Sequence, residues 1–169
     1  MAWFSGPLGV LGLLAVTNSN GARNRESARA DNRRMQTREP DARTDALARS
    51  VIGAAIEVHR TLGPGYLEHV YEEAMCVELE LRGLPFERQS KIAVRYKGRP
   101  IGESRLDLLV AGHLIVELKA VTSIAPIHRA QVLSYLKATD RPLALLINFN
   151  VPVLRDGIHR VVLNARPSS

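Results

Sequence analysis

Apolar residues at helical spacing predict two helices in the segment that begins near Asp41. The first helix has Asp41 or Thr44 as its N-cap and ends at Gly63-Pro64-Gly65. Its apolar positions are Leu47, Val51, Ile52, Ala55, Ile56 and Val58. The second helix is expected from about Tyr66 to Leu81, with Gly83 beyond its end. Its apolar face is expected to hold Val70, Ala74, Val77 and Leu81.

The period then changes to two, which is typical of strands. Ile92, Val94 and Tyr96 alternate with polar residues, and residues 97–99 predict a turn. Further strands are expected over residues 105–110, 114–120, 143–149 and 158–163, and a third helix over 126–139. Residues 143–149 are almost wholly apolar, which indicates a strand buried on both faces. The predicted order is ααβββαββ, an α/β (α+β) domain whose mixed central sheet is flanked by helices.

The pair of strands around Ala111-Gly112-His113 contains the candidate chemistry. Alternation puts Leu106, Leu108 and Val110 on one face of the first strand, and Asp107 with Arg105 on the other. On the second strand, Leu114, Val116 and Leu118 oppose Glu117 and Lys119. A three-residue loop keeps both apolar rows together and pairs Asp107 with Glu117, whereas a two-residue loop mixes the faces.

Two carboxylates at paired positions lie about 5 Å apart and repel each other. A divalent cation between Asp107 and Glu117 relieves that repulsion, while Arg105, facing Lys119, suits a phosphate. A slip by two residues also preserves the faces. It forms a surface ladder that pairs Arg105 with Glu117 and Glu103 with Lys119, so the register alone leaves both interpretations open.

Two helices add further polar candidates. Glu68 and Glu72 are four residues apart on the second helix and share a face. His128, Gln131 and Tyr135 form one stripe on the third helix. Taken singly, each of these residues is also explained by an ordinary role at a helix end or at the boundary of the core.

The first 40 residues differ from the rest of the chain. The apolar run from Pro7 to Val16 is far shorter than the roughly 20 residues that span a bilayer. Neither a preceding basic residue nor a clear cleavage site supports a secretory signal. Residues 21–44 lack an apolar period and are expected to be disordered. Residues 1–40 are therefore interpreted as a disordered or misread extension, with Met35 as an alternative start, and residues 41–165 as the single domain.

Composition narrows the function only a little. The chain of 169 residues carries a net charge of +6, and residues 1–44 account for half of it, with seven arginines against four acidic residues. The remaining basic character suits a phosphate-binding protein without demonstrating one. The one cysteine, Cys76, excludes a disulfide scaffold and is expected to be buried.

Several segments together resemble the GxxExxY family. The signature is Gly65-Tyr66-Leu67-Glu68-His69-Val70-Tyr71, and the resemblance extends over Val51 to Leu163, including Ile52–His59 and Leu145–Phe149. That family is placed in the PD-(D/E)XK nuclease-like superfamily, nearest the RecB and lambda exonuclease branch. The resemblance implies a restriction-endonuclease-like core. Leu106 precedes Asp107 here, in place of the proline of the superfamily name.

The resemblance also implies the roles of the site residues. Asp107, Glu117 and Glu68, with Glu72 as the alternative to Glu68, are expected to bind Mg²⁺ or Mn²⁺, because both cations prefer oxygen ligands. Lys119, Gln131 and Tyr135 complete the expected catalytic set. Arg105 and His128 are expected to bind substrate.

The expected function is metal-dependent hydrolysis of phosphodiester bonds in nucleic acid, with DNA preferred, by a cytoplasmic protein that does not enter the membrane. A module on the same fold that binds nucleic acid or protein without cleaving it is the alternative. Few aromatic residues argue against a binder that works by stacking on bases. The sequence specifies no oligomeric state.

Overall fold

The computed structural model describes residues 40–163, which belong to one compact unit. The predictions made for residues 1–39 and 164–165 lie outside the described residues. The elements in chain order are α2 (Ala42–Leu62), α3 (Glu68–Leu81), β1 (Phe86–Tyr96), β2 (Arg99–Val110), β3 (Leu114–Lys119), α4 (Pro126–Thr139), β4 (Leu143–Asn148), α5 (Leu154–Gly157) and β5 (Ile158–Val162). The predicted order is confirmed, apart from the short helix α5, which was not expected.

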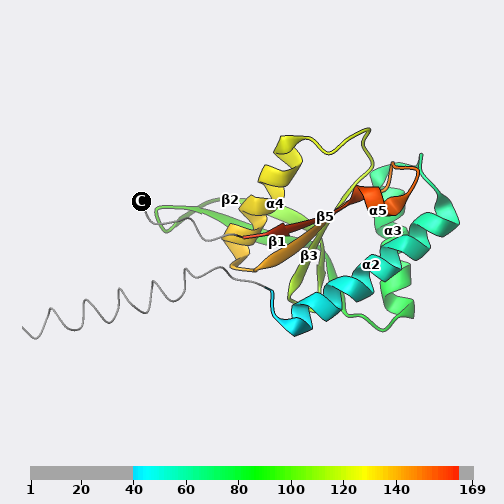
Figure 1. Ribbon diagram of the computed structural model, residues 1–169. Helices are drawn as coiled ribbons and strands as arrows, with labels where there is room; N and C mark the ends of the chain where they lie inside the picture. Colours follow the sequence, from blue (N-terminus) through cyan, green and yellow to red (C-terminus); the bar gives the residue numbers. More distant parts are fainter. Residues whose placement is uncertain (1–39, 164–169) are drawn as a thin grey trace, which may run out of the picture. The chain divides into compact units, whose positions relative to one another are not determined.

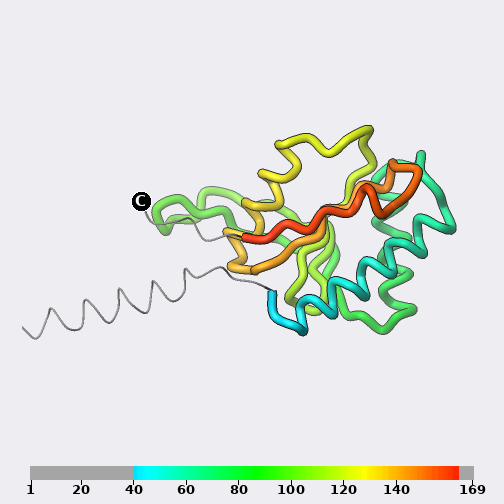
Figure 2. The backbone as a smooth tube through the Cα atoms, in the orientation of Figure 1, coloured from blue at the N-terminus to red at the C-terminus, as the bar shows by residue number. Residues whose placement is uncertain are grey.

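The five strands form one mixed sheet in the order β1-β2-β3-β4-β5, with β3 and β4 parallel and the other neighbours antiparallel. Helices α2 and α3 pack on one face and α4 on the other, so two hydrophobic clusters sandwich the central strands (Figures 1 and 2). This arrangement confirms the predicted α/β class and is consistent with a restriction-endonuclease-like fold. Among residues 40–163, no helix has both the length and the apolar character needed to cross a membrane.

Helix α2 begins where a capping residue was expected. The Asp41 carboxylate accepts a hydrogen bond from the Thr44 amide at 2.7 Å, so Asp41, and not Thr44, is the N-cap. Val51, Ala55 and Val58 are buried as predicted, but Ile56 is exposed. The small residues Ala48 and Ala54 complete the buried face instead, which lets the helix approach the sheet closely.

Helix α3 presents a different face to the core from the one predicted. Tyr71, Met75 and Leu79 are fully buried, whereas Val77 and Leu81 are 56% and 78% exposed. Both stripes have helical spacing, and tertiary packing selects the one that contains Tyr71. The Tyr71 ring stacks on Phe149, after β4, with centroids 4.5 Å apart. Cys76 is buried on this helix as expected.

Strands β1 and β2 are longer than predicted and form a hairpin around Lys97-Gly98. Both turn residues have positive φ, at 48° and 79°, which matches the twist of the two strands. Only the inner end of this hairpin continues into the sheet, because β2 pairs with β3 over just Leu108–Val110. The outer end extends beyond the other strands (Figure 1).

Candidate active site

The β2–β3 hairpin has the register that a three-residue loop requires. Leu108 pairs with Val116 and Val110 pairs with Leu114, which confirms that register and excludes the slip by two residues. Followed away from the loop, regular pairing ends at Leu108, so Asp107 is the first residue of β2 outside the ladder. The Asp107 carboxylate instead accepts a hydrogen bond from the backbone amide of Leu118 at 2.8 Å. Asp107 is therefore held at the point where the two strands separate.

The regular alternation of side chains along β2 is interrupted at this same residue. Leu108 and Val110 belong to the cluster under α2 and α3, whereas Leu106 belongs to the cluster under α4. The prediction that Leu106 shares a face with Leu108 and Val110 is therefore wrong. On the neighbouring strand, Gln89 adopts a φ of 51°, and it is the position opposite Asp107 that the ladder skips. A local twist of both strands thus breaks the simple alternation and directs Asp107 toward β3.

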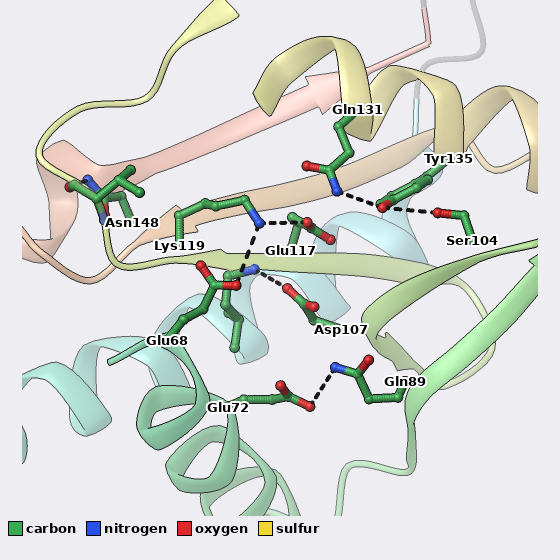
Figure 3. A network of polar contacts seen from close by, with 12 residues as sticks. Glu68, Glu72, Gln89, Ser104, Asp107, Glu117, Lys119, Gln131, Tyr135 and Asn148 are labelled. Carbon is green, nitrogen blue, oxygen red and sulfur yellow. Dashed lines mark hydrogen bonds and ion pairs between the residues drawn. The ribbon is translucent and has the colours of Figure 1, made fainter. Parts of the chain in front are cut away.

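Lys119 connects the acidic residues (Figure 3). Its Nζ lies 2.8 Å from Glu117 Oε1 and 3.8 Å from Glu68 Oε1, at the start of α3. Arg105 does not pair with Lys119 as expected, because β2 and β3 are no longer paired at these positions. Arg105 is exposed and pairs with Lys91 across the β1–β2 ladder.

Burial and mutual repulsion change the acidity of this group. Burial, reinforced by the charge of Asp107, raises the pKa of Glu117 from 4.5 to about 7. Burial also raises the pKa of Asp107, although the Leu118 amide and Lys119 oppose the shift. Burial acts to lower the pKa of Lys119, but its hydrogen bond to Glu117 and the surrounding carboxylates outweigh that effect and raise it. Lys119 is therefore an ammonium ion, and Glu117 titrates near neutral pH.

The Gly65–Tyr71 motif positions Glu68. Gly65 has a φ of 109°, which favours glycine, and Glu68 is the first residue of α3. The Tyr71 hydroxyl donates to the Gly63 carbonyl at 2.7 Å and accepts from the Tyr66 amide at 3.2 Å. The tyrosine of the motif thus fixes the loop that delivers its glutamate to the site.

The two candidate glutamates on α3 have different surroundings. Glu68 is half-buried and faces Lys119. Glu72 is buried, and its Oε1 accepts hydrogen bonds from Arg88 at 2.6 Å and Gln89 at 2.9 Å. This arrangement favours Glu68 as the third carboxylate. It gives Glu72 a role in holding the part of β1 that lies opposite Asp107.

The predicted residues of α4 form a separate small network. Gln131 donates to the Tyr135 hydroxyl at 2.7 Å, and that hydroxyl also accepts from Ser104 at 3.3 Å (Figure 3). The network ties α4 to β2. At the start of the same helix, His128 Nδ1 accepts a hydrogen bond from the Ala125 amide at 3.1 Å and so caps the helix.

Asn148 is a supporting residue that the sequence reasoning missed. It ends β4 beside Lys119, and its side chain binds both the amide and the carbonyl of Val121, at 3.0 and 2.8 Å. Gly157 lies so close to the Asn148 carbonyl that a Cβ there would collide with it. The signal in the sequence was a single amide at the end of an otherwise apolar strand.

The donor atoms suit a hard divalent cation. Glu117 is only 2% exposed, and within residues 40–163 its Oε2 has no hydrogen-bond partner, an arrangement that is unfavourable unless a ligand binds there. The same residues contain no group of three His, Cys, Asp or Glu side chains close enough to hold a metal ion. Instead, the Lys119 ammonium bridges Glu117 and Glu68. The carboxylates therefore fit such a cation chemically, and Lys119 has to release at least one of them to it.

A sequence model described as the PD-(D/E)XK nuclease superfamily matches residues 45–161. No curated protein matches the chain. One solved structure with some likeness, titled "Crystal structure of SSO0001", has a TM-score of 0.42 and 15% sequence identity. The match covers 59% of this chain and 50% of that one, so the chain corresponds to about half of that structure.

Proposed function

The chain belongs to the PD-(D/E)XK nuclease superfamily, and from that premise we propose that it hydrolyses phosphodiester bonds of nucleic acid with Mg²⁺ or Mn²⁺. The observation that carries the proposal is the convergence of Asp107, Glu117 and Lys119 where β2 parts from β3, with one buried Glu117 oxygen that has no hydrogen-bond partner among residues 40–163. Buried carboxylates that repel each other are costly to the fold, which makes a functional role the better explanation.

Asp107 and Glu117 would hold the cation, with Glu68 and the Leu118 carbonyl as further ligands. When bound, such a cation polarises the phosphate and makes water more acidic. Lys119 would orient the attacking water or stabilise the negative charge that develops on the phosphoryl oxygens. Its contacts with Glu117 and Glu68 support this assignment, because they keep the ammonium within the site.

The remaining residues would act on the substrate. Gln131 and Tyr135 would position Lys119 and a phosphate oxygen, and their mutual hydrogen bond prepares them to act as a unit. Arg105, exposed on β2, would bind the phosphate backbone. His128 Nδ1 accepts from the helix, which leaves Nε2–H of the neutral ring as the donor to a phosphate.

A finer assignment follows from the Gly65–Tyr71 motif. We place the chain in the GxxExxY family, near the RecB and lambda exonuclease branch, and propose DNA as the preferred substrate and the cytoplasm as its location. The motif supports this placement through its structure, since Gly65 and Tyr71 both serve to position Glu68.

Nicking of supercoiled plasmid, together with cleavage of single- and double-stranded DNA and RNA oligonucleotides, tests the function. Asp107→Asn keeps an oxygen that can accept the Leu118 amide but removes the charge, so it is expected to fold and to lose cleavage. Asp156→Asn, at an exposed position on α5, is the matched control.

The outcomes separate the two function classes. Cleavage that requires Mg²⁺ or Mn²⁺ and disappears in Asp107→Asn but not in Asp156→Asn supports the nuclease. Binding of nucleic acid without cleavage supports the non-catalytic module. Absence of both cleavage and calorimetric binding of either cation would refute the nuclease.

A further inference from the structure

The outer part of the β1–β2 hairpin, residues 91–105, is a free two-stranded ribbon that we call the arm. Every residue from 93 to 103 is exposed, and the two strands pair only with each other there. Figures 1 and 2 show the arm continuing past the ends of the neighbouring strands. The rest of the described chain, residues 40–163, leaves residues 93–103 of this ribbon uncovered, whereas Ile92 and Ser104 at its base contact the α4 side of the sheet.

The arm is strongly basic. Its one acidic residue is Glu103, and its basic residues are Lys91, Arg95, Lys97, Arg99 and Arg105. Within the described residues, only Lys91 of these five forms an ion pair, with Glu103 at 3.1 Å. Lys91 and Arg105 are also cross-strand partners, and like charges at such positions repel each other. A negatively charged partner relieves this repulsion.

The backbone of the arm is already ordered for binding. Arg95 donates to the Gly98 carbonyl at 3.0 Å and so closes the Lys97-Gly98 turn. The register shifts after Val94, which leaves Ile101 as an extra residue that increases the twist of the ribbon. At the base, Ser104 contacts Tyr135 of α4. Little conformational entropy of the backbone is therefore left to lose when a ligand binds.

The geometry points to nucleic acid as that ligand, and we propose that the arm holds the substrate on one side of the active site. A two-stranded ribbon fits the major groove of a duplex. The run from Arg99 to Asp107 spans about 26 Å, so the arm would contact phosphates up to about eight nucleotides from the scissile bond. The direction in which the substrate lies along the arm rests on the proposed function, because it assumes that cleavage takes place at Asp107, at the inner end of the same strand.

A protein surface is the competing occupant, because Val94, Tyr96 and Ile101 are exposed on the arm. The charge favours nucleic acid, since the cores of protein interfaces are depleted in charged residues, whereas a cluster of several basic residues is typical of nucleic-acid binders. Tyr96 also suits this ligand, because an exposed aromatic ring beside a cation, Lys97 at 5.6 Å, is able to stack on a base.

The test compares two triple variants of the full chain. Arg95→Gln/Lys97→Gln/Arg99→Gln removes three of the five positive charges of the arm, and Arg49→Gln/Lys137→Gln/Arg155→Gln removes equal charge from exposed positions on three helices. Binding of a labelled 30-base-pair duplex is measured by fluorescence anisotropy in EDTA between 50 and 200 mM salt. The arm variant is expected to lose roughly tenfold or more in affinity and about 2–3 units of the salt slope, and the control much less.

Equal losses in both variants, or an unchanged slope in the arm variant, would overturn the proposal. So would a change in molecular mass by light scattering with unchanged binding, since the arm would then contact protein. EDTA keeps this result independent of catalysis. Arm-dependent binding without any cleavage would refute the nuclease alone, and cleavage with arm-independent binding would refute the arm alone.

Discussion

The Lys119 ammonium lies 2.8 Å from one carboxylate oxygen of Glu117, while the other oxygen has no hydrogen-bond partner within residues 40–163. The two oxygens of one buried side chain are therefore unequal. The lysine compensates part of the charge, and the remaining oxygen is available to a cation or a proton. Competition between these two ligands governs how the site responds to pH.

Cation affinity is expected to rise with pH up to neutrality. The pKa of Glu117 is about 7, so below that value a cation has to displace a proton. We expect the apparent affinity for Mn²⁺ or Mg²⁺ to increase by up to about tenfold per pH unit between pH 5.5 and 7, and to level off above pH 8. Calorimetry in two buffers of different ionisation enthalpy also measures the proton released.

Two variants serve as the references for this titration. Glu117→Gln is expected to lose both the affinity and the proton release. Glu73→Gln, which alters an exposed carboxylate that contacts Arg88, is expected to behave as the wild type. Affinity that does not change between pH 5.5 and 8 in the wild type would contradict a role for Glu117 as a ligand.

Without divalent cations, the same residue is expected to make the fold less stable at higher pH. The folded pKa of Glu117 lies above its unfolded value, so the native state binds the proton more tightly, and the stabilisation is lost between pH 4.5 and about 7. The free energy of unfolding should fall by about 2–3 kcal/mol more in the wild type than in Glu117→Gln across this window. Urea titrations in EDTA at pH 5 and pH 8 measure the difference. A larger fall in the variant would show that the sign is wrong.

Removing the hydroxyl of Tyr71 is expected to disturb Glu68 without disturbing the core. Tyr71→Phe keeps the stacking on Phe149 but loses the hydrogen bonds to Gly63 and Tyr66, which should cost about 1–2 kcal/mol. Cleavage should fall roughly tenfold, because small displacements of a catalytic group are costly.

Tyr66→Phe is the matched control for this change. Tyr66 is half exposed, and the hydrogen bond it makes to Tyr71 uses its backbone amide, so the variant retains that contact. It should remain within about 0.5 kcal/mol of the wild type. Equal losses in the two variants would remove the special role assigned to Tyr71.

The Asn148 side chain is expected to hold the segment that follows Lys119. Asn148→Ala leaves both polar groups of the Val121 backbone without their partner and should cost about 2–3 kcal/mol. Hydrogen exchange of the Val121 amide should accelerate. Asn150→Ala keeps the Asn150 amide that donates to Asn148 and should leave that exchange rate unchanged, and similar rates in both variants would argue against the clamp.

The β2–β3 register and the site residues on it could be predicted, because loop length and face alternation together allow few solutions. The position of Leu106 could not. Alternation assumes a regular strand, and the contact of Leu106 with the α4 cluster belongs to tertiary structure. The same limit explains the expected meeting of Arg105 with Lys119, which a ladder continued past Leu108 would have produced.

Helix α3 shows how two patterns compete. Val70, Ala74 and Val77 repeat at helical spacing as well as Tyr71 and Met75 do, so hydropathy does not decide which stripe is buried. The deciding contact is between Tyr71 and Phe149, which are far apart in the sequence. The arm was missed for a related reason, since an exposed ribbon and a half-buried strand show the same alternation.

Where β2 passes from one hydrophobic cluster to the other, the Asp107 carboxylate belongs to neither and depends on both. Repacking either side of the sheet would turn the strand about this residue and re-aim its side chain. The orientation of the Asp107 side chain thus depends on the packing on both faces of the sheet. Substitutions at Leu106 or Leu108, neither of which bears a functional group, would therefore change the orientation of the Asp107 carboxylate before they unfold the domain.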